Sequence, residues 1–181
     1  MSHPIYYDSI INEARLLEQL AVASKESISI LRTIYPEIEE PPMVTRFSSE
    51  IMEYKIWLIE TVSSSLISCA TRTRVLQDSY DFSIEHNPTY SADKEAFDDV
   101  PNIVEIKIGD FSPSIRECCN KIIHATSYDL EFELDSYGTE YWTGWCILSG
   151  KKFGKKDWCI KLNTIHFGMA LRNYISIIKY L

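Results

Sequence analysis

The feature that most constrains this chain is a long helical repeat of apolar residues between positions 46 and 77. Apolar side chains recur there at steps of three and four, which is the spacing of one face of an α-helix. This stripe consists of Phe47, Ile51, Tyr54, Leu58, Val62, Leu66 and Cys69. The apolar residues that lie off the stripe are Ile56, Trp57, Ile59 and Ile67. The helix is therefore expected to be buried among several neighbours and, at about 50 Å long, to kink near Ser63–Ser65.

A second amphipathic helix is predicted for residues 8–34. Its apolar stripe consists of Ile10, Ala14, Leu17, Ala21, Ile28 and Leu31. Asp8 or Ser9 can cap its start by accepting backbone N–H groups that have no partner within the helix. Pro36 is expected to end it, because proline disfavours helical geometry in the residue before it.

Two shorter helices are predicted in the second half of the chain. The first spans about 112–125 and opens at Ser112-Pro113, a serine N-cap followed by a proline in the first helical position. The other spans about 164–181 and carries an apolar face that ends at Leu181.

A small antiparallel sheet is predicted before the last helix. Residues 103–108 alternate between apolar and charged side chains, and the period is again two in several runs between 129 and 162. Gly150–Lys156 is expected to be a hairpin turn. Residues 78–101 are rich in turn formers and are expected to be a surface loop with one helical turn at Asp93–Phe97.

The order of these elements predicts the fold class. Runs of helices followed by runs of strands exclude a parallel α/β sheet, in which the two would alternate. We therefore expect an α+β, mostly α fold: a four-helix bundle with a small antiparallel sheet inserted before the last helix. The 181 residues suit one domain, spanning 1–181.

Charge and hydropathy exclude several classes of protein. The net charge of −8 argues against a nonspecific nucleic-acid coat protein. Residues 112–181 hold nine basic and seven acidic side chains, so an anionic ligand should prefer this part, although the acidic remainder can equally serve solubility alone. No apolar run approaches a membrane span, and Met1–Asp8 lack signal-peptide features, so a cytoplasmic protein without a membrane partner is expected.

The cysteines and histidines predict no disulfide framework and no metal site. Five cysteines without a Cys-x-x-Cys pair are expected to be buried free thiols. The four histidines show no metal-ligand spacing with them. We therefore expect no metal and no cofactor.

One polar cluster carries most of the functional signal. Arg116, Asn120 and His124 are spaced four residues apart, on one face of the predicted helix, with Lys121 adjacent. A guanidinium can bind phosphate, an amide can orient it, and an imidazole can move protons near neutral pH. Such groups can cleave RNA without a metal, the base taking the ribose 2′-hydroxyl proton and the cation stabilising charge on phosphorus. The alternative is structural: His124 caps the helix and Asn120 bonds a neighbouring loop.

The segment Asn120-Lys121-Ile122-Ile123-His124, between long helices, resembles the HEPN superfamily. This resemblance implies a helical bundle that pairs as a homodimer, and a metal-independent endoribonuclease of a host-defence or toxin–antitoxin system. It implies catalytic roles for His124, Asn120 and Arg116, with RNA or a nucleotide as ligand. The family places its arginine directly before the asparagine, with four to six residues between it and the histidine. Here that position is Cys119, and seven residues separate Arg116 from His124.

Because some HEPN proteins lack the active-site arginine and act as scaffolds, the sequence leaves catalysis open. The alternative is a non-catalytic partner-binding module whose acidic N-terminal helices contact another protein. Four lysines of the predicted hairpin are further candidates for RNA contact, or are simply solvated: Lys151, Lys152, Lys155 and Lys156. Trp142 and Trp145 have opposite strand parity, so at least one of them should be in the core.

Overall fold

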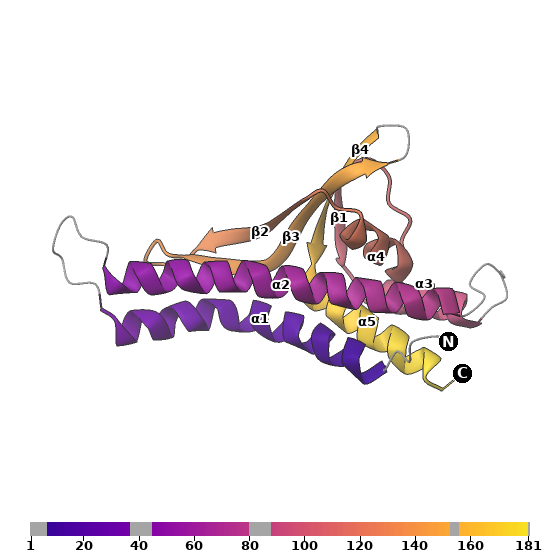
Figure 1. Ribbon diagram of the computed structural model, residues 1–181, viewed down its shortest axis with the longest axis horizontal. Helices are drawn as coiled ribbons and strands as arrows, with labels where there is room; N and C mark the ends of the chain where they lie inside the picture. The colour runs from indigo at the N-terminus through magenta and orange to yellow at the C-terminus, as the bar shows by residue number, and fades with distance from the viewer. Residues whose placement is uncertain (1–6, 37–44, 80–87, 153–155, 181) are drawn as a thin grey trace.

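The computed structural model describes residues 7–36, 45–79, 88–152 and 156–180, and shows a mixed helical and β structure (Figure 1). Helices make up 63% of it. The helices are α1 (Tyr7–Ile34), α2 (Arg46–Ser79), α3 (Pro88–Asp98), α4 (Ile115–Ile123) and α5 (Thr164–Ile178). The strands are β1 (Val104–Ile108), β2 (Ser127–Leu134), β3 (Glu140–Lys152) and β4 (Lys156–Asn163). The predicted α+β, mostly α class is confirmed.

The two long helices, α1 and α2, lie side by side and antiparallel (Figure 1). At one end Glu13 of α1 accepts a hydrogen bond from Ser68 at 2.7 Å and pairs with Arg72 at 3.0 Å. At the other end Ile28 packs with Phe47 and Ile51. The predicted stripe of each helix is the face that it turns inward, because burying it removes apolar surface from water.

The kink predicted in α2 is wrong. The helix is continuous from Arg46 to Ser79, and no sharp bend is visible along it (Figure 1). Ser65 is buried, whereas Ser63 is partly exposed. Without a proline in this stretch, no backbone hydrogen bond has to be broken, so α2 has no reason to bend sharply there.

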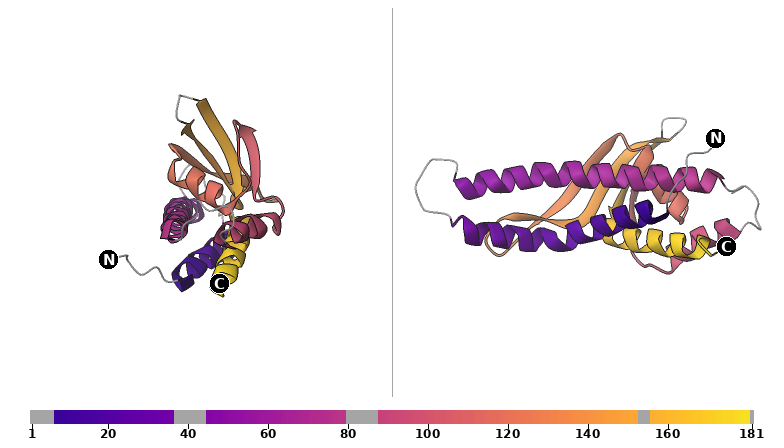
Figure 2. Two further views of the ribbon diagram at one scale, coloured as in Figure 1. Left: turned by 90° about the vertical axis from the view of Figure 1, so that its right-hand side faces the viewer. Right: turned by 60° about the horizontal axis from the view of Figure 1, so that its bottom comes forward.

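Helix α5 packs along α1 on the side away from α2 (Figure 2). Gly168 permits the contact, because a Cβ atom there would lie 3.0 Å from the carbonyl oxygen of Ala14. Arg172 fixes the pair with a two-pronged ion pair to Glu18, at 2.8 and 2.9 Å. This contact places the start of α5 next to the sheet.

Helix α3 occupies part of the segment predicted as a loop: the predicted helical turn at Asp93–Phe97 lies within it, and the loop prediction is wrong for residues 88–92. Its buried face consists of Thr89, Ala92, Asp93, Ala96 and, just beyond the helix, Val100. These positions have helical spacing but are small or polar, and such residues give a weak hydrophobic signal. Asp78 and Ser79, also predicted as loop, belong to α2, and residues 80–87 lie outside the described residues.

The strands form one antiparallel sheet in the order β1-β4-β3-β2. Strands β3 and β4 form the predicted hairpin, which is paired as far as Lys152 and Lys156. One face of the sheet packs on the helices and supplies buried side chains: Leu130, Trp142, Cys146, Leu148, Trp158, Ile160 and Leu162. Trp142 is in the core and Trp145 is half-buried, as strand parity required.

Helix α4 begins two residues later than predicted. Ser114, rather than Ser112, is the N-cap, and its hydroxyl accepts a hydrogen bond from the backbone N–H of Glu117 at 3.1 Å. Ser114 and Glu117 are the first and last residues of a capping-box sequence, so this start is also consistent with local rules. The last helical residue is Ile123, and His124 is the C-cap.

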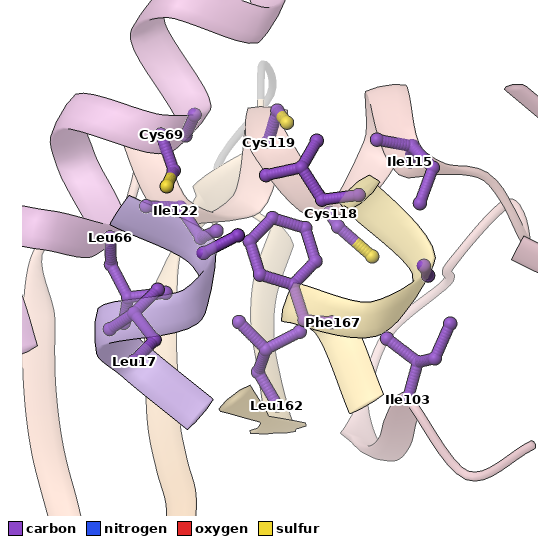
Figure 3. Close-up of a cluster of buried hydrophobic side chains, with 14 of the residues drawn as sticks. Leu17, Leu66, Cys69, Ile103, Ile115, Cys118, Cys119, Ile122, Leu162 and Phe167 are labelled. Carbon is purple, nitrogen blue, oxygen red and sulfur yellow. The ribbon is translucent and has the colours of Figure 1, made fainter. Parts of the chain in front are cut away.

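The core is centred on Phe167 of α5, which lies among side chains from α1, α2, α4 and the sheet (Figure 3). Its neighbours there are Leu17, Leu66, Cys69, Ile103, Ile115, Cys118, Cys119, Ile122 and Leu162. All five cysteines are free thiols, and Cys159 alone is half-buried. Burial raises the pKa of Cys69 to about 12. The prediction of buried free thiols is thus confirmed for four of the five.

Candidate functional site

The polar face of α4 lies against the C-terminal part of α2 (Figure 1). Arg116 and Asn120 are half-buried at this contact, whereas His124 is exposed at the end of the helix. Cys119, the residue directly before Asn120, is fully buried and faces the core. The position at which the HEPN pattern carries arginine therefore cannot present a cation to solvent in this chain.

Helix α2 supplies an arginine that the sequence did not identify. Arg74 donates a hydrogen bond from Nη1 to the side-chain oxygen of Asn120. The amide nitrogen of Asn120 in turn donates to Glu117 at 3.3 Å. Arg74 and Asn120 are 46 positions apart, so only the packing of α2 on α4 brings a guanidinium onto the asparagine face.

Asp78 links the two arginines. Its Oδ1 accepts a hydrogen bond from Arg116 Nη2 at 2.8 Å, and both of its oxygens lie 3.2 Å from Arg74 Nη2. Partial burial raises the pKa of Asp78, but the hydrogen bonds and charges of Arg116 and Arg74 outweigh it and hold that pKa below its ordinary value. Asp78 is therefore a carboxylate at neutral pH, bound by two guanidinium groups.

A buried carboxylate lies beneath this ion pair. Asp93 of α3 accepts hydrogen bonds at 2.9 Å from the backbone N–H of Arg116 and from Gln77 Nε2. It thus satisfies a free N–H in the first turn of α4 from outside the helix. Burial raises the pKa of Asp93 to about 6, although its hydrogen bonds from Arg116 and Gln77 and the nearby positive charges oppose the shift.

The candidate lysines are placed differently from one another. Lys121 is buried, with its ammonium 4.3 Å from the Trp158 ring centre and 3.6 Å from a Glu117 oxygen, so it is not presented to solvent. Lys151 is exposed on β3. The side chains of Lys152 and Lys156, and all of Lys155, lie outside the described part of the structure.

The end of α4 meets the base of the lysine hairpin. The backbone oxygen of His124 approaches Gly150, where a Cβ atom would lie only 2.8 Å from it. Next to it, the backbone N–H of Thr126 donates to Ser149 at 2.8 Å. The exposed imidazole of His124 is therefore at the end of α4 that contacts β3, the strand that carries Lys151. His166, the other histidine of the C-terminal half, instead contacts the carbonyl oxygen of Asn102 at 3.3 Å.

These groups have a defined chemical capacity. Two guanidiniums and an amide can bind and orient an anion, and an exposed imidazole can transfer protons. Among the described residues, no three His, Cys, Asp or Glu side chains cluster as metal ligands would. Within the same residues, no helix combines the length and the hydropathy that crossing a membrane requires.

Sequence reasoning missed Arg74, Asp78 and Asp93. Arg74 and Asp78 form an i,i+4 pair in the last turns of α2, and that charged pair was the available signal. Asp93 gave no signal, because nothing in its neighbourhood predicted burial.

Comparison with protein-family models, with curated proteins and with solved structures finds no match to this chain.

Proposed function

We propose that this chain is a HEPN-like, RNA-directed protein of the cytoplasm that acts in host defence or as a toxin–antitoxin component. In this proposal the α4 face carrying Asn120 and His124 contacts RNA, and His124 is the proton carrier of a metal-independent endoribonuclease. The helical part of the fold would correspond to the HEPN bundle, with the sheet as an insertion before α5.

The observation that carries the proposal is the hydrogen bond from Arg74 of α2 to Asn120 of α4. The HEPN pattern needs a guanidinium beside the asparagine, and Cys119 cannot provide it because it is buried. Arg74 supplies this group from the neighbouring helix, while Arg116 lies one turn before Asn120. The exposed position of His124 beside the lysine hairpin adds a proton carrier at an accessible surface.

Cleavage is tested with a single substitution, His124→Ala. Wild-type protein is expected to cleave a mixed-sequence RNA in the presence of EDTA, and the variant to lose this activity by about 10²–10⁴-fold, because the imidazole would move the proton. The variant should retain the melting temperature within about 1–2 °C. The imidazole is exposed and forms no hydrogen bond within the described residues, and surface changes of that kind are usually worth less than ~0.5 kcal/mol.

The matched control is His166→Ala, which removes a second imidazole from the surface at the start of α5. It should leave cleavage unchanged. A wild-type protein that cleaves no RNA, or a His166→Ala variant that loses as much activity as His124→Ala, would contradict the proposed chemistry.

A second function, a partner-binding module, is favoured by a different observation. Four apolar residues form an exposed row on α2, which we call the outer stripe: Met52, Ile56, Ile59 and Ile67. They are 40–65% exposed and follow steps of four, three and eight, so they share one helix face that the rest of the described chain leaves open. Such a face is typical of helices that pair with a second chain. A homodimer through α2 is the form that we propose.

A further inference from the structure

We propose that Arg74 and Arg116 form a binding site for a phosphate group, and that the Asp78 carboxylate occupies this site in the free protein as an intramolecular competitor. The inference rests on the proposed function in taking the phosphate of an RNA chain as the natural ligand. The phosphate site itself can be tested without RNA.

Two guanidinium groups already bind an anion here, the carboxylate of Asp78. Guanidiniums from two different helices converge on one carboxylate, at 2.8 Å from Arg116 and 3.2 Å from Arg74. Guanidinium groups bind carboxylate and phosphate in the same planar, forked manner. Any anion that replaced the Asp78 carboxylate would meet the same two cations.

The Arg74 guanidinium and the backbone of Arg116 are held in place independently of Asp78. Asn120 accepts a hydrogen bond from Arg74, and Glu117 in turn accepts one from Asn120. The backbone N–H of Arg116 is bound by Asp93, within a buried contact between α3 and α4. Arg74 therefore does not need the carboxylate for its orientation, and Arg116 extends from a backbone that is fixed without it.

Asp78 is the most exposed member of the group. Its side chain is 52% exposed, against 21% for Arg74 and 29% for Arg116. An exposed ion pair contributes little to stability, because water solvates the separated charges well. The carboxylate can therefore move into solvent at small cost, while the two guanidiniums remain at the surface of the α2–α4 contact.

Arg74 has a hydrogen-bond donor that Asp78 does not use and that a larger anion could bind. Asp78 contacts Arg74 only through Nη2, and Arg74 Nε is buried without a hydrogen-bond partner in the described part of the chain. A phosphate group offers more acceptor oxygens than a carboxylate and carries more charge. Glu117 pairs with Lys121 at 3.6 Å, whereas Asp78 pairs with both arginines.

The test compares two variants that remove the same charge. Asp78→Asn removes the competitor but keeps the size of the side chain, and Asp129→Asn neutralises an exposed acid on β2. Binding of inorganic pyrophosphate is measured by calorimetry, and binding of a fluorescein-labelled 12-nucleotide oligouridylate by anisotropy. Asp78→Asn is expected to bind both about tenfold more tightly than wild type, and Asp129→Asn no more than about twofold.

The dependence on arginine is tested in the same background. Adding Arg74→Gln or Arg116→Gln to Asp78→Asn should abolish the gain for both ligands. If Asp78→Asn does not fold, Asp78→Ser takes its place, since Asp78 is half-exposed in the last turn of α2 and serine is tolerated there.

The outcomes separate the two proposals. A gain for pyrophosphate without any RNA binding supports the phosphate site and contradicts the RNA-directed function. A gain for either ligand that Asp129→Asn reproduces, or that survives loss of the arginines, overturns the site, because the effect would then be one of net charge. Absence of any gain with Asp78→Asn overturns it as well, even if wild-type protein cleaves RNA.

Discussion

At the scale of single residues, Asp93 is the acidic side chain that is buried among those that the structure describes. It is 1% exposed and lies between Gln77 of α2 and the first turn of α4. Its carboxylate is partly compensated by the hydrogen bonds that it accepts and by the positive end of the α4 dipole. Burial nevertheless disfavours the ionised form, which is why its pKa is raised to about 6.

This shift predicts a pH dependence of stability. In the unfolded chain the Asp93 pKa returns to 3.8, so the folded state binds its proton more tightly than the unfolded state does. The resulting stabilisation is full below about pH 4 and is lost as the pH rises through about 6. A shift of this size corresponds to about 3 kcal/mol of unfolding free energy.

The measurement is urea unfolding of wild type and Asp93→Asn between pH 4 and 7. Asparagine keeps an oxygen for the Arg116 and Gln77 N–H groups but does not titrate, so the difference between the two proteins isolates Asp93 from other carboxylates, including Asp78. Wild type should lose stability relative to the variant as the pH rises. Parallel pH profiles would show that Asp93 does not titrate in this range.

At the scale of elements, the junction between α4 and the β3–β4 hairpin depends on Gly150. A Cβ atom at this position would lie 2.6 Å from a ring carbon of Trp158 and 2.8 Å from the backbone oxygen of His124. Both distances are shorter than van der Waals contact, and neither the buried ring nor a backbone oxygen can move freely. Glycine thus allows the end of α4 to reach the sheet, and this contact positions His124.

Gly150→Ala is therefore expected to destabilise the protein by about 1–3 kcal/mol, which corresponds to roughly 3–10 °C in melting temperature. Ser149→Ala, the neighbouring position on β3, is the control and should change the melting temperature by less than about 2 °C. Thermal melts followed by circular dichroism measure both. Equal melting temperatures for Gly150→Ala and wild type would mean that this junction is loosely packed.

At the scale of the whole molecule, the arrangement of layers leaves part of α2 open. Helices α1 and α4 cover two of its faces, and the β2–β3 end of the sheet contacts its N-terminal half, where Lys55 pairs with Glu140 (Figure 1). The outer stripe of α2 remains exposed, with Met52 at 65% and Ile59 at 40%. A single chain of this fold thus presents the apolar surface that a second copy would bury.

The proposed dimer predicts a solution mass of twice 21.0 kDa at micromolar concentration. Replacing Ile56 and Ile59 together by lysine should yield the monomer mass, because two charges would be buried at the interface. Val22→Lys, on α1, alters an apolar side chain that is 71% exposed and lies outside the stripe, so it should leave the dimer intact. Light scattering distinguishes the two masses, and a wild-type monomer would refute the dimer under these conditions.

Much of the fold could be predicted from the sequence because the signals are local. The stripes of α1 and α2 repeat over about six helical turns each, and the predicted boundaries are within two residues at both ends of each helix. Alternation identified the strands, and strand parity identified Trp142 as a core candidate. Most of helix α3 was not predicted, because its buried face holds small and polar side chains, whose burial depends on what packs against them.

The candidate site was decided by tertiary structure. The sequence placed Arg116, Asn120 and His124 on one helix face, since that follows from helical periodicity alone. It could not place Arg74 against Asn120, or Asp78 between two arginines, because these contacts join segments about 40 positions apart. Packing of α2 on α4 decides them, while Lys121 is buried beside Trp158 of β4 and His124 remains exposed. Periodicity determines which face a residue occupies, whereas only the assembled chain determines what that face meets.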